Sequence, residues 1–207
     1  MGCVVTCYTS YMPERGVLLT DTEGRSFWFD AGAPSLTWAL SGGEGFRAEY
    51  EVLHRPEDLL PWTKSSLGIK VGRVSARELA DAKRLREAIW QCADARADGR
   101  SLPSEHAQEI NHFASRPPLI PQIRRDDRRV WAEPLTYRQV LSMIARDAVD
   151  LYTGTSPQRI RRCAGINCYL IFVDTSRPGR RRWCSMDRCG NRAKVNAFRS
   201  RATEEEA

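Results

Sequence analysis

Four closely spaced cysteines toward the C-terminal end constrain this chain more than any other feature. They form two C-x4-C pairs, separated by 15 residues, at Cys163, Cys168, Cys184 and Cys189. A structural zinc ion takes four soft ligands in a tetrahedron, and two local pairs closed by a hairpin supply them without a large core. No secretory signal is recognisable, and a reducing cytosol disfavours disulfides. We therefore expect one structural Zn²⁺ ion per chain; a disulfide-paired or redox cluster is the alternative.

The residues within each pair suit metal binding. In the first pair, Gly165 and Asn167 can adopt positive φ, so that the chain curls into a knuckle with both thiolates inward. Two cysteines five apart in a regular helix diverge by about 140°. We therefore expect Ser185 to be the N-cap of a helix, with one cysteine just before it and the other in the first turn. This helix should continue to about Arg201.

The segment between the pairs reads as a β-hairpin. YLIFVD and RRRW have the character of strands, and TSRPG between them supplies turn geometry through Pro178 and Gly179. A knuckle, a hairpin and a helix that carries the last ligand together describe a treble-clef-like finger.

The charge of the chain is concentrated in this finger. Residues 155–201 hold twelve Lys and Arg against two acidic residues, whereas the whole chain has a net charge of only +6. A basic module on a mildly acidic body is typical of proteins that meet a polyanion, and we expect double-stranded DNA as the partner. RNA is less favoured because the basic face lacks an aromatic stacking platform. A zinc-stabilised RNA-binding or protein-interaction adaptor is the alternative.

The expected DNA contacts divide between the hairpin and the helix. They are Arg177, Arg180, Arg181, Arg182, Arg188, Arg192, Lys194, Asn196 and Arg199. Helical spacing places Arg188, Arg192, Asn196 and Arg199 on one stripe, and Val195 and Phe198 on another. We expect the apolar stripe to pack against the rest of the finger and the polar stripe to meet the DNA.

The sequence that precedes the finger, called the body here, predicts an α/β arrangement with a hairpin and about three helices. The expected fold class of the whole chain is therefore α+β. The hairpin should span Gly16–Asp30, after which Pro34 and SGGEG break the pattern. A short helix should begin near Pro56. The three main helices should run from the Ser75 and Glu78 capping box to Gly99, from Pro103 to Ala114, and from Thr136 to Gly154. Two short strands should lie within PPLIPQIRRDDRRVW, and TGTSPQ is the expected domain boundary.

Other functional classes find little support. The three histidines, His54, His106 and His112, have no metal-site spacing, and no H-E-x-x-H, G-x-S-x-G or phosphate-binding glycine loop is present. We therefore do not expect an enzyme. No run of about 18 apolar residues could span a bilayer, so we expect a cytoplasmic protein without a membrane partner.

Residues 1–15 are expected to be an extension of uncertain order. MGCVVT fits the pattern for myristoylation at Gly2 next to a palmitoylatable Cys3. The alternatives are an edge strand, or a true start at Met12.

The C-terminal segment closely resembles the CGNR zinc finger, through FVDTSR, RRWCSM and CGNRAK. The body resembles the ABATE domain of bacterial stress-response transcription regulators, through FWFDAG, RPEDLLPW and LREAI, although Ala33 and Pro34 stand where family members often have Asn-Thr. The resemblance implies a body at 16–154, a finger at 159–203, and a DNA-binding transcription regulator. The body would sense a small-molecule effector or form a homodimer, with Phe29 and Asp30 as candidate ligand-binding residues.

Overall fold

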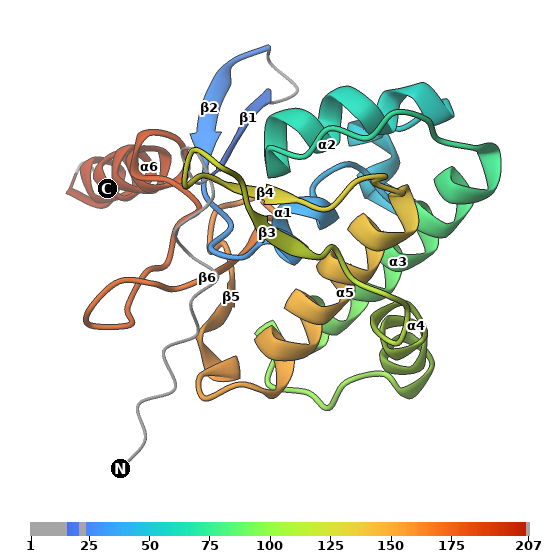
Figure 1. Ribbon diagram of the computed structural model, residues 1–207. Helices are drawn as coiled ribbons and strands as arrows, with labels where there is room; N and C mark the ends of the chain where they lie inside the picture. The colour runs from blue at the N-terminus through green and yellow to red at the C-terminus, as the bar shows by residue number, and fades with distance from the viewer. Residues whose placement is uncertain (1–15, 21–23, 206–207) are drawn as a thin grey trace.

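The computed structural model describes residues 16–20 and 24–205, with side chains described as far as residue 198. The predicted lipidation motif and the edge strand at residues 1–15 lie outside this range. The predicted α+β fold class is confirmed: a largely helical body with small antiparallel strand pairs is followed by the four-cysteine finger (Figure 1). Within the described part, no helix is both long and apolar enough to cross a membrane.

The predicted N-terminal hairpin is present. Strands β1 (Val17–Thr20) and β2 (Ser26–Phe29) pair antiparallel, with Val17 opposite Phe29. Successive side chains of a strand point to opposite faces. Accordingly, Phe29 is fully buried and Phe27 packs against the core, whereas Trp28 between them is half exposed.

The segment after the hairpin, expected to be irregular, contains a short helix instead. Helix α1 (Pro34–Ala39) begins with Pro34 at its first position, where the missing N–H costs no hydrogen bond. It buries Leu36 and Trp38. Six residues are too few to show helical periodicity, which is why the proline read as a breaker. A 3₁₀ turn (Gly45–Tyr50) follows, and then η2 (Pro56–Asp58) and α2 (Leu59–Leu67), where a short helix was expected.

Three longer helices build the core of the body, as predicted. They are α3 (Ala76–Ala97), α4 (Ser104–Ala114) and α5 (Tyr137–Thr153). Ser75 with Glu78 caps α3, and Thr136 with Gln139 caps α5, each in a reciprocal capping box. The three helices pack on one another, and strands β3 (Pro121–Ile123) and β4 (Arg129–Trp131) form the second hairpin that was expected.

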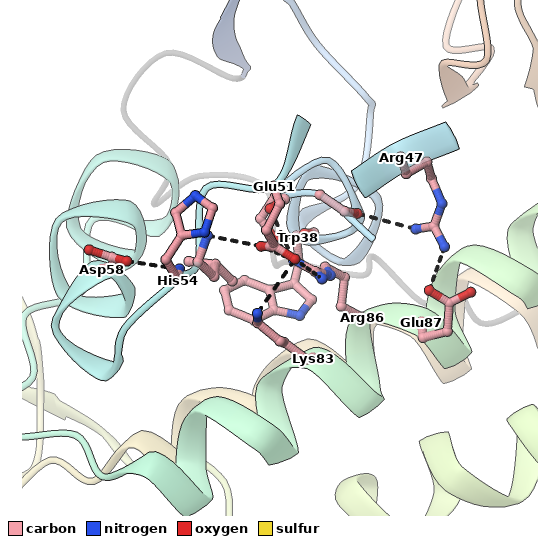
Figure 2. A network of polar contacts seen from close by, with 11 residues as sticks. Trp38, Arg47, Glu51, His54, Asp58, Lys83, Arg86 and Glu87 are labelled. Atoms are coloured by element: carbon pink, nitrogen blue, oxygen red, sulfur yellow. Dashed lines mark hydrogen bonds and ion pairs between the residues drawn. The ribbon is translucent and has the colours of Figure 1, made fainter. Parts of the chain in front are cut away.

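Two buried ion pairs attach the segment around the 3₁₀ turn to α3 (Figure 2). Both terminal guanidinium nitrogens of Arg86, Nη1 and Nη2, donate to the Glu51 carboxylate, at 2.8 and 2.6 Å, and Nη1 also donates to the Ser41 carbonyl at 2.9 Å. Arg47 pairs with Glu87, the residue that follows Arg86 on α3. Ion pairs this deeply buried fix how a loop lies on a helix, because moving either partner alone leaves an unpaired charge.

The finger begins with a turn at Pro157–Arg159 and contains strands β5 (Ile160–Arg162) and β6 (Ile171–Val173). The predicted pairing of YLIFVD with RRRW is wrong, because β6 pairs with β5, with Ile160 opposite Val173. Asp174 explains the difference: its carboxylate accepts hydrogen bonds from the N–H groups of Ser176 and Arg181, at 2.9 and 2.8 Å. These bonds close residues 174–181 into a loop and leave residues 180–183 outside the strand pair.

The finger ends in a widened helical turn (Met186–Gly190) that continues into α6 (Asn191–Glu205). It does not stand apart from the body. Ile160, Phe172 and the four cysteines belong to the same buried cluster as the core helices, and β5 lies along α3. The two parts therefore share one hydrophobic core.

Candidate metal centre and basic surface

The structure brings the four predicted cysteines together. Their Sγ atoms all lie within 4.8 Å of one another, and all four side chains are buried. Cys184 Sγ is 3.8 Å from Cys168 Sγ and 3.5 Å from Cys189 Sγ. Tetrahedral zinc with Zn–S bonds of about 2.3 Å requires sulfur atoms about 3.8 Å apart. The described residues therefore provide a four-thiolate site that could hold a metal ion and that fits zinc.

Local geometry in the first pair explains why its two cysteines converge. Asn167 has φ of 55°, as predicted for the knuckle. Gly165 does not need positive φ, contrary to the prediction, but it needs the room: a Cβ there would lie 2.7 Å from Cys189 Sγ. Real Cβ atoms do not approach sulfur this closely, so only glycine allows the knuckle to close against the second pair.

The second pair is positioned by a helix start, as predicted. The Ser185 hydroxyl accepts a hydrogen bond from the N–H of Arg188 at 3.2 Å, which makes it the N-cap. The Gly190 N–H then reaches back five residues to the Ser185 carbonyl at 3.1 Å. A turn closed over five residues is wider than an α-helical turn, and it brings Cys189 to the side of Cys184.

The electrostatics of the cluster favour a bound cation. The pKa of Cys163 is lowered to about 2, because its sulfur accepts hydrogen bonds from Cys168, from Cys184, and from the backbone N–H groups of Cys184 and Gly165. The pKa values of the other three are raised: that of Cys168 chiefly by its bond to Cys163, and that of Cys189 chiefly by burial. Without a metal ion, one thiolate thus opposes ionisation of its neighbours, and a divalent cation removes that opposition.

Several basic residues of the finger have internal roles. The Arg181 guanidinium lies 4.1 Å from the Phe172 ring centre and donates to the Trp183 carbonyl at 3.0 Å. Arg188, half buried, lies 4.6 Å from the Phe27 ring centre, with Nη1 3.6 Å from Cys168 Sγ. Both were expected to contact DNA; the structure instead places them inside the finger and against the body.

The other predicted contacts lie at the surface. Exposed among them are Arg177, Arg180, Arg182, Arg192, Lys194 and Asn196, while Arg199 lies in α6 beyond the described side chains. Arg161, which was not among the predicted contacts, is exposed as well. The expected packing of the apolar side of α6 is wrong, because Val195 and Phe198 are 47% and 68% exposed. Among the elements that the structure describes, α6 packs mainly on the turn that precedes it, Met186–Gly190 (Figure 1).

The suggested ligand site at Phe29 and Asp30 is not supported by the arrangement around it. Phe29 is fully buried and offers a ligand no surface. One carboxylate oxygen of Asp30 accepts the Gly32 N–H at 2.7 Å, and the next carbonyl, of Ala31, accepts the N–H of Val173 in the finger at 2.9 Å. The end of this strand is therefore hydrogen-bonded to the finger.

Comparison with known families assigns both parts. Residues 32–155, more than half of the chain, match the ABATE family, described as "Putative stress-induced transcription regulator". Residues 159–202, with all four cysteines, match the CGNR zinc finger. Neither is an enzyme family. No curated protein matches the chain. The chain therefore belongs to the ABATE family and carries a CGNR zinc finger after its ABATE domain.

Proposed function

We propose that this protein is a zinc-dependent transcription regulator whose finger binds double-stranded DNA. The proposal rests on a difference among the basic residues of the finger: some make contacts within the protein, and others are exposed. Arg159, Arg162, Arg181 and Arg188 serve the fold, whereas a second set remains exposed. Exposed like charges on one small module repel one another, and a polyanion relieves that repulsion.

The exposed residues come from three elements. Arg161 is on β5, Arg177, Arg180 and Arg182 are on the loop that follows β6, and Arg192 and Lys194 are on α6. Arg180 and Arg182 flank the internal Arg181, and both face solvent. These side chains would grip phosphates and position the finger, without reading sequence.

Helix α6 is the candidate for base recognition. Arg192 and Asn196 are four residues apart, one helical turn, and both are exposed. In the major groove, arginine pairs with guanine and asparagine with adenine through two hydrogen bonds each. The zinc ion, one per chain, would hold the start of this helix against the knuckle; a closed set of four thiolates leaves no open position for catalysis.

The test is a titration of specific and scrambled duplexes over a series of salt concentrations. Replacing Arg180 and Arg182 by Gln should weaken binding to both duplexes and reduce the log–log salt slope by about 0.9 for each phosphate that is no longer bound. Replacing Arg192 by Gln or Asn196 by Ala should reduce the difference in binding free energy between the specific and the scrambled duplex by about 1–3 kcal/mol. Arg138→Gln, an exposed arginine of α5, is the matched control and should change neither. Unchanged affinity and discrimination in both finger sets would overturn the proposal.

One observation supports a second candidate function, a protein-interaction adaptor. The exposed Val195 and Phe198 give α6 an apolar side that could meet another protein. In that case Phe198→Ala would abolish partner binding, while duplex affinity would be weak and independent of sequence. Dimerisation of the body and a cytoplasmic location follow from the proposed role and stay predictions.

A further inference from the structure

An apolar cavity of about 100 Å³ lies where the body meets the finger. Its body side is formed by Phe27 of β2, by Leu36 and Leu40 at α1, and by Trp90 of α3. Its finger side is formed by residues 167–171 and by Arg188. The wall includes Cys168, one of the four thiol ligands. The cavity therefore belongs to neither part alone.

The walls of this cavity are linked by aromatic contacts. The centre of the Phe46 ring, on the 3₁₀ turn of the body, lies 4.1 Å from the centre of the Tyr169 ring in the finger, and the angle between the ring planes is 35°. It also contacts Trp90 edge to face at 5.8 Å. Phe46 and Tyr169 are both part of the cavity wall and both partly exposed. Aromatic side chains so arranged favour another ring as the bound group.

The charges near the cavity restrict what can enter. Its charged wall residues are Arg47 and Arg188, and no Asp or Glu is among the described residues that form the wall. Arg47 is paired with Glu87 and lies 4.1 Å from the Trp90 ring centre, so its charge is largely compensated. Arg188 lies on the Phe27 ring. This wall tolerates a neutral or anionic group and disfavours a cation.

We propose that this cavity is a binding site for a small single-ring aromatic compound that is neutral or anionic. An apolar protein cavity of about 150 Å³ holds benzene. A cavity of about 100 Å³ that is partly open to solvent therefore admits one ring, with a polar substituent toward the mouth. The site differs from Phe29 and Asp30, which do not line it. The 3₁₀ turn forms one wall of the cavity, and the ion pairs that join this segment to α3 hold that wall in place (Figure 2).

Binding at this site would act on the finger directly. A bound ring would press on Tyr169, the residue after Cys168, and on Arg188, whose Nη1 lies 3.6 Å from the Cys168 sulfur. Any ligand that binds two parts of a protein together changes how readily they separate. As an effector site, which rests on the proposed function, the cavity would couple ligand binding to the placement of α6.

The test uses the full chain without DNA and three probes of similar size: phenol, benzoate and benzylamine. Calorimetry and ligand-detected NMR should show saturable one-to-one binding of phenol or benzoate, with benzylamine weaker by about tenfold. Phe46→Ala and Tyr169→Ala should each weaken binding by about tenfold. Trp28→Ala, on the opposite face of β2, is the matched control. No saturable binding of any probe at millimolar concentration, or binding that both variants leave intact, would overturn the inference.

A second measurement locates the bound probe. With cobalt in place of zinc, the thiolate-to-metal absorption bands report the surroundings of Cys168. A probe concentration that just saturates the wild type should shift these bands fully there and clearly less in Phe46→Ala, whose affinity is lower. Unchanged bands in a saturated wild-type protein would place the probe elsewhere and contradict the assignment. Because DNA is absent throughout, failure of DNA binding would leave this site standing, and failure of probe binding would leave the proposed function standing.

Discussion

The backbone N–H of Val173 in the finger donates a 2.9 Å hydrogen bond to the carbonyl of Ala31 at the end of the body hairpin. The next residue, Gly32, has φ of 80°, and a Cβ at this position would lie 2.9 Å from Val173 Cβ. The body thus ends its first hairpin with a residue that must be glycine both for its backbone and for its neighbour. The finger is held against the body at this point, so the two parts should respond together to changes in either one.

Gly32→Ala should weaken the contact between body and finger. The backbone strain of positive φ costs about 1 kcal/mol, and the clash with Val173 should add about 1–3 kcal/mol. Gly24→Ala is the matched control, because Gly24 has φ of 78° and the added Cβ would meet no atom of the described residues within 4 Å. Urea unfolding would measure the free energy of unfolding of both variants and the wild type. Proteolysis near residues 154–158 would detect release of the finger. Equal losses in the two variants would show that the Val173 contact is not tight.

Removal of the metal should unfold the finger and loosen the body. We expect one zinc per chain in the wild type and loss of most of it in Cys168→Ser, because three thiolates cannot close the tetrahedral shell. Cys92→Ser is the control: this thiol is buried on α3, with its pKa raised to about 11 by burial, and lies apart from the cluster. It should lower stability and keep the metal. Metal analysis of unoxidised protein decides the point, and less than half an equivalent in the wild type would contradict the assignment.

Local features of this fold could be predicted from the sequence. Ser75, Thr136 and Ser185 each cap a helix, and the hydrogen bonds that define these caps join residues three apart. The cysteine spacing likewise predicted the cluster, because knuckle geometry is set within five residues. Such contacts do not depend on where the rest of the chain lies.

Contacts between distant segments could not be predicted. The sequence predicted RRRW as the partner of β6, whereas β6 pairs with β5 and Asp174 closes the loop that follows β6. The role of Arg181 depends on Phe172, and that of Arg188 depends on Phe27 in a different part of the chain. A basic residue in a basic segment reads as a surface charge until the aromatic ring beneath it is known. Sequence reasoning therefore overestimates the exposed basic surface at these two positions.

Arg86→Met should be strongly destabilising. Arg86 is 3% exposed and holds Glu51 with two hydrogen bonds. Its removal leaves a largely buried carboxylate whose remaining partners among the described residues include the Leu53 N–H, at 2.9 Å, and Lys83, at 3.6 Å. Breaking a buried pair in this way costs about 3–5 kcal/mol. The double variant with Glu51→Gln should recover part of the loss, since the unpaired charge is gone. Denaturant unfolding of the four proteins completes the cycle; strictly additive losses would show that the pair is not coupled.

The same pairs should make the body sensitive to acid. Burial raises the pKa of Glu51, but hydrogen bonds from Arg86 and the Leu53 N–H outweigh it, and the net pKa is lowered; the pKa of Glu87 is lowered likewise. A carboxyl with a lowered folded-state pKa contributes stability above its unfolded pKa of about 4.3 and loses it as pH falls through the folded value. Urea midpoints from about pH 6 to about pH 3 should therefore fall more steeply in the wild type than in the double variant. Parallel curves would exclude these groups as the source.

Two adjacent arginines of β5 allow a test that separates the proposed DNA binding from stability. Arg161 is exposed, whereas Arg162 binds Asp94 of α3 at 2.5 Å and the neighbouring Asp98 at 3.0 Å. Adjacent side chains of a strand point to opposite sides, so Arg161 points to solvent and, in the proposed function, to DNA, whereas Arg162 points to the body. Arg161→Gln should reduce the log–log salt slope of duplex binding by about 0.9 and leave stability within about 0.5 kcal/mol of the wild type.

Arg162→Gln removes the same charge from the same strand, but it should affect stability and not the salt dependence of duplex binding. It should lower the free energy of unfolding by about 1 kcal/mol, since the pair is partly open to solvent, and it should leave the salt slope unchanged. Salt-series titrations and urea unfolding of both variants measure the two effects side by side. Because net charge falls equally, an effect of overall charge alone would lower the slopes equally. That result would refute the assignment of Arg161 to the DNA-facing surface and of Arg162 to the body contact.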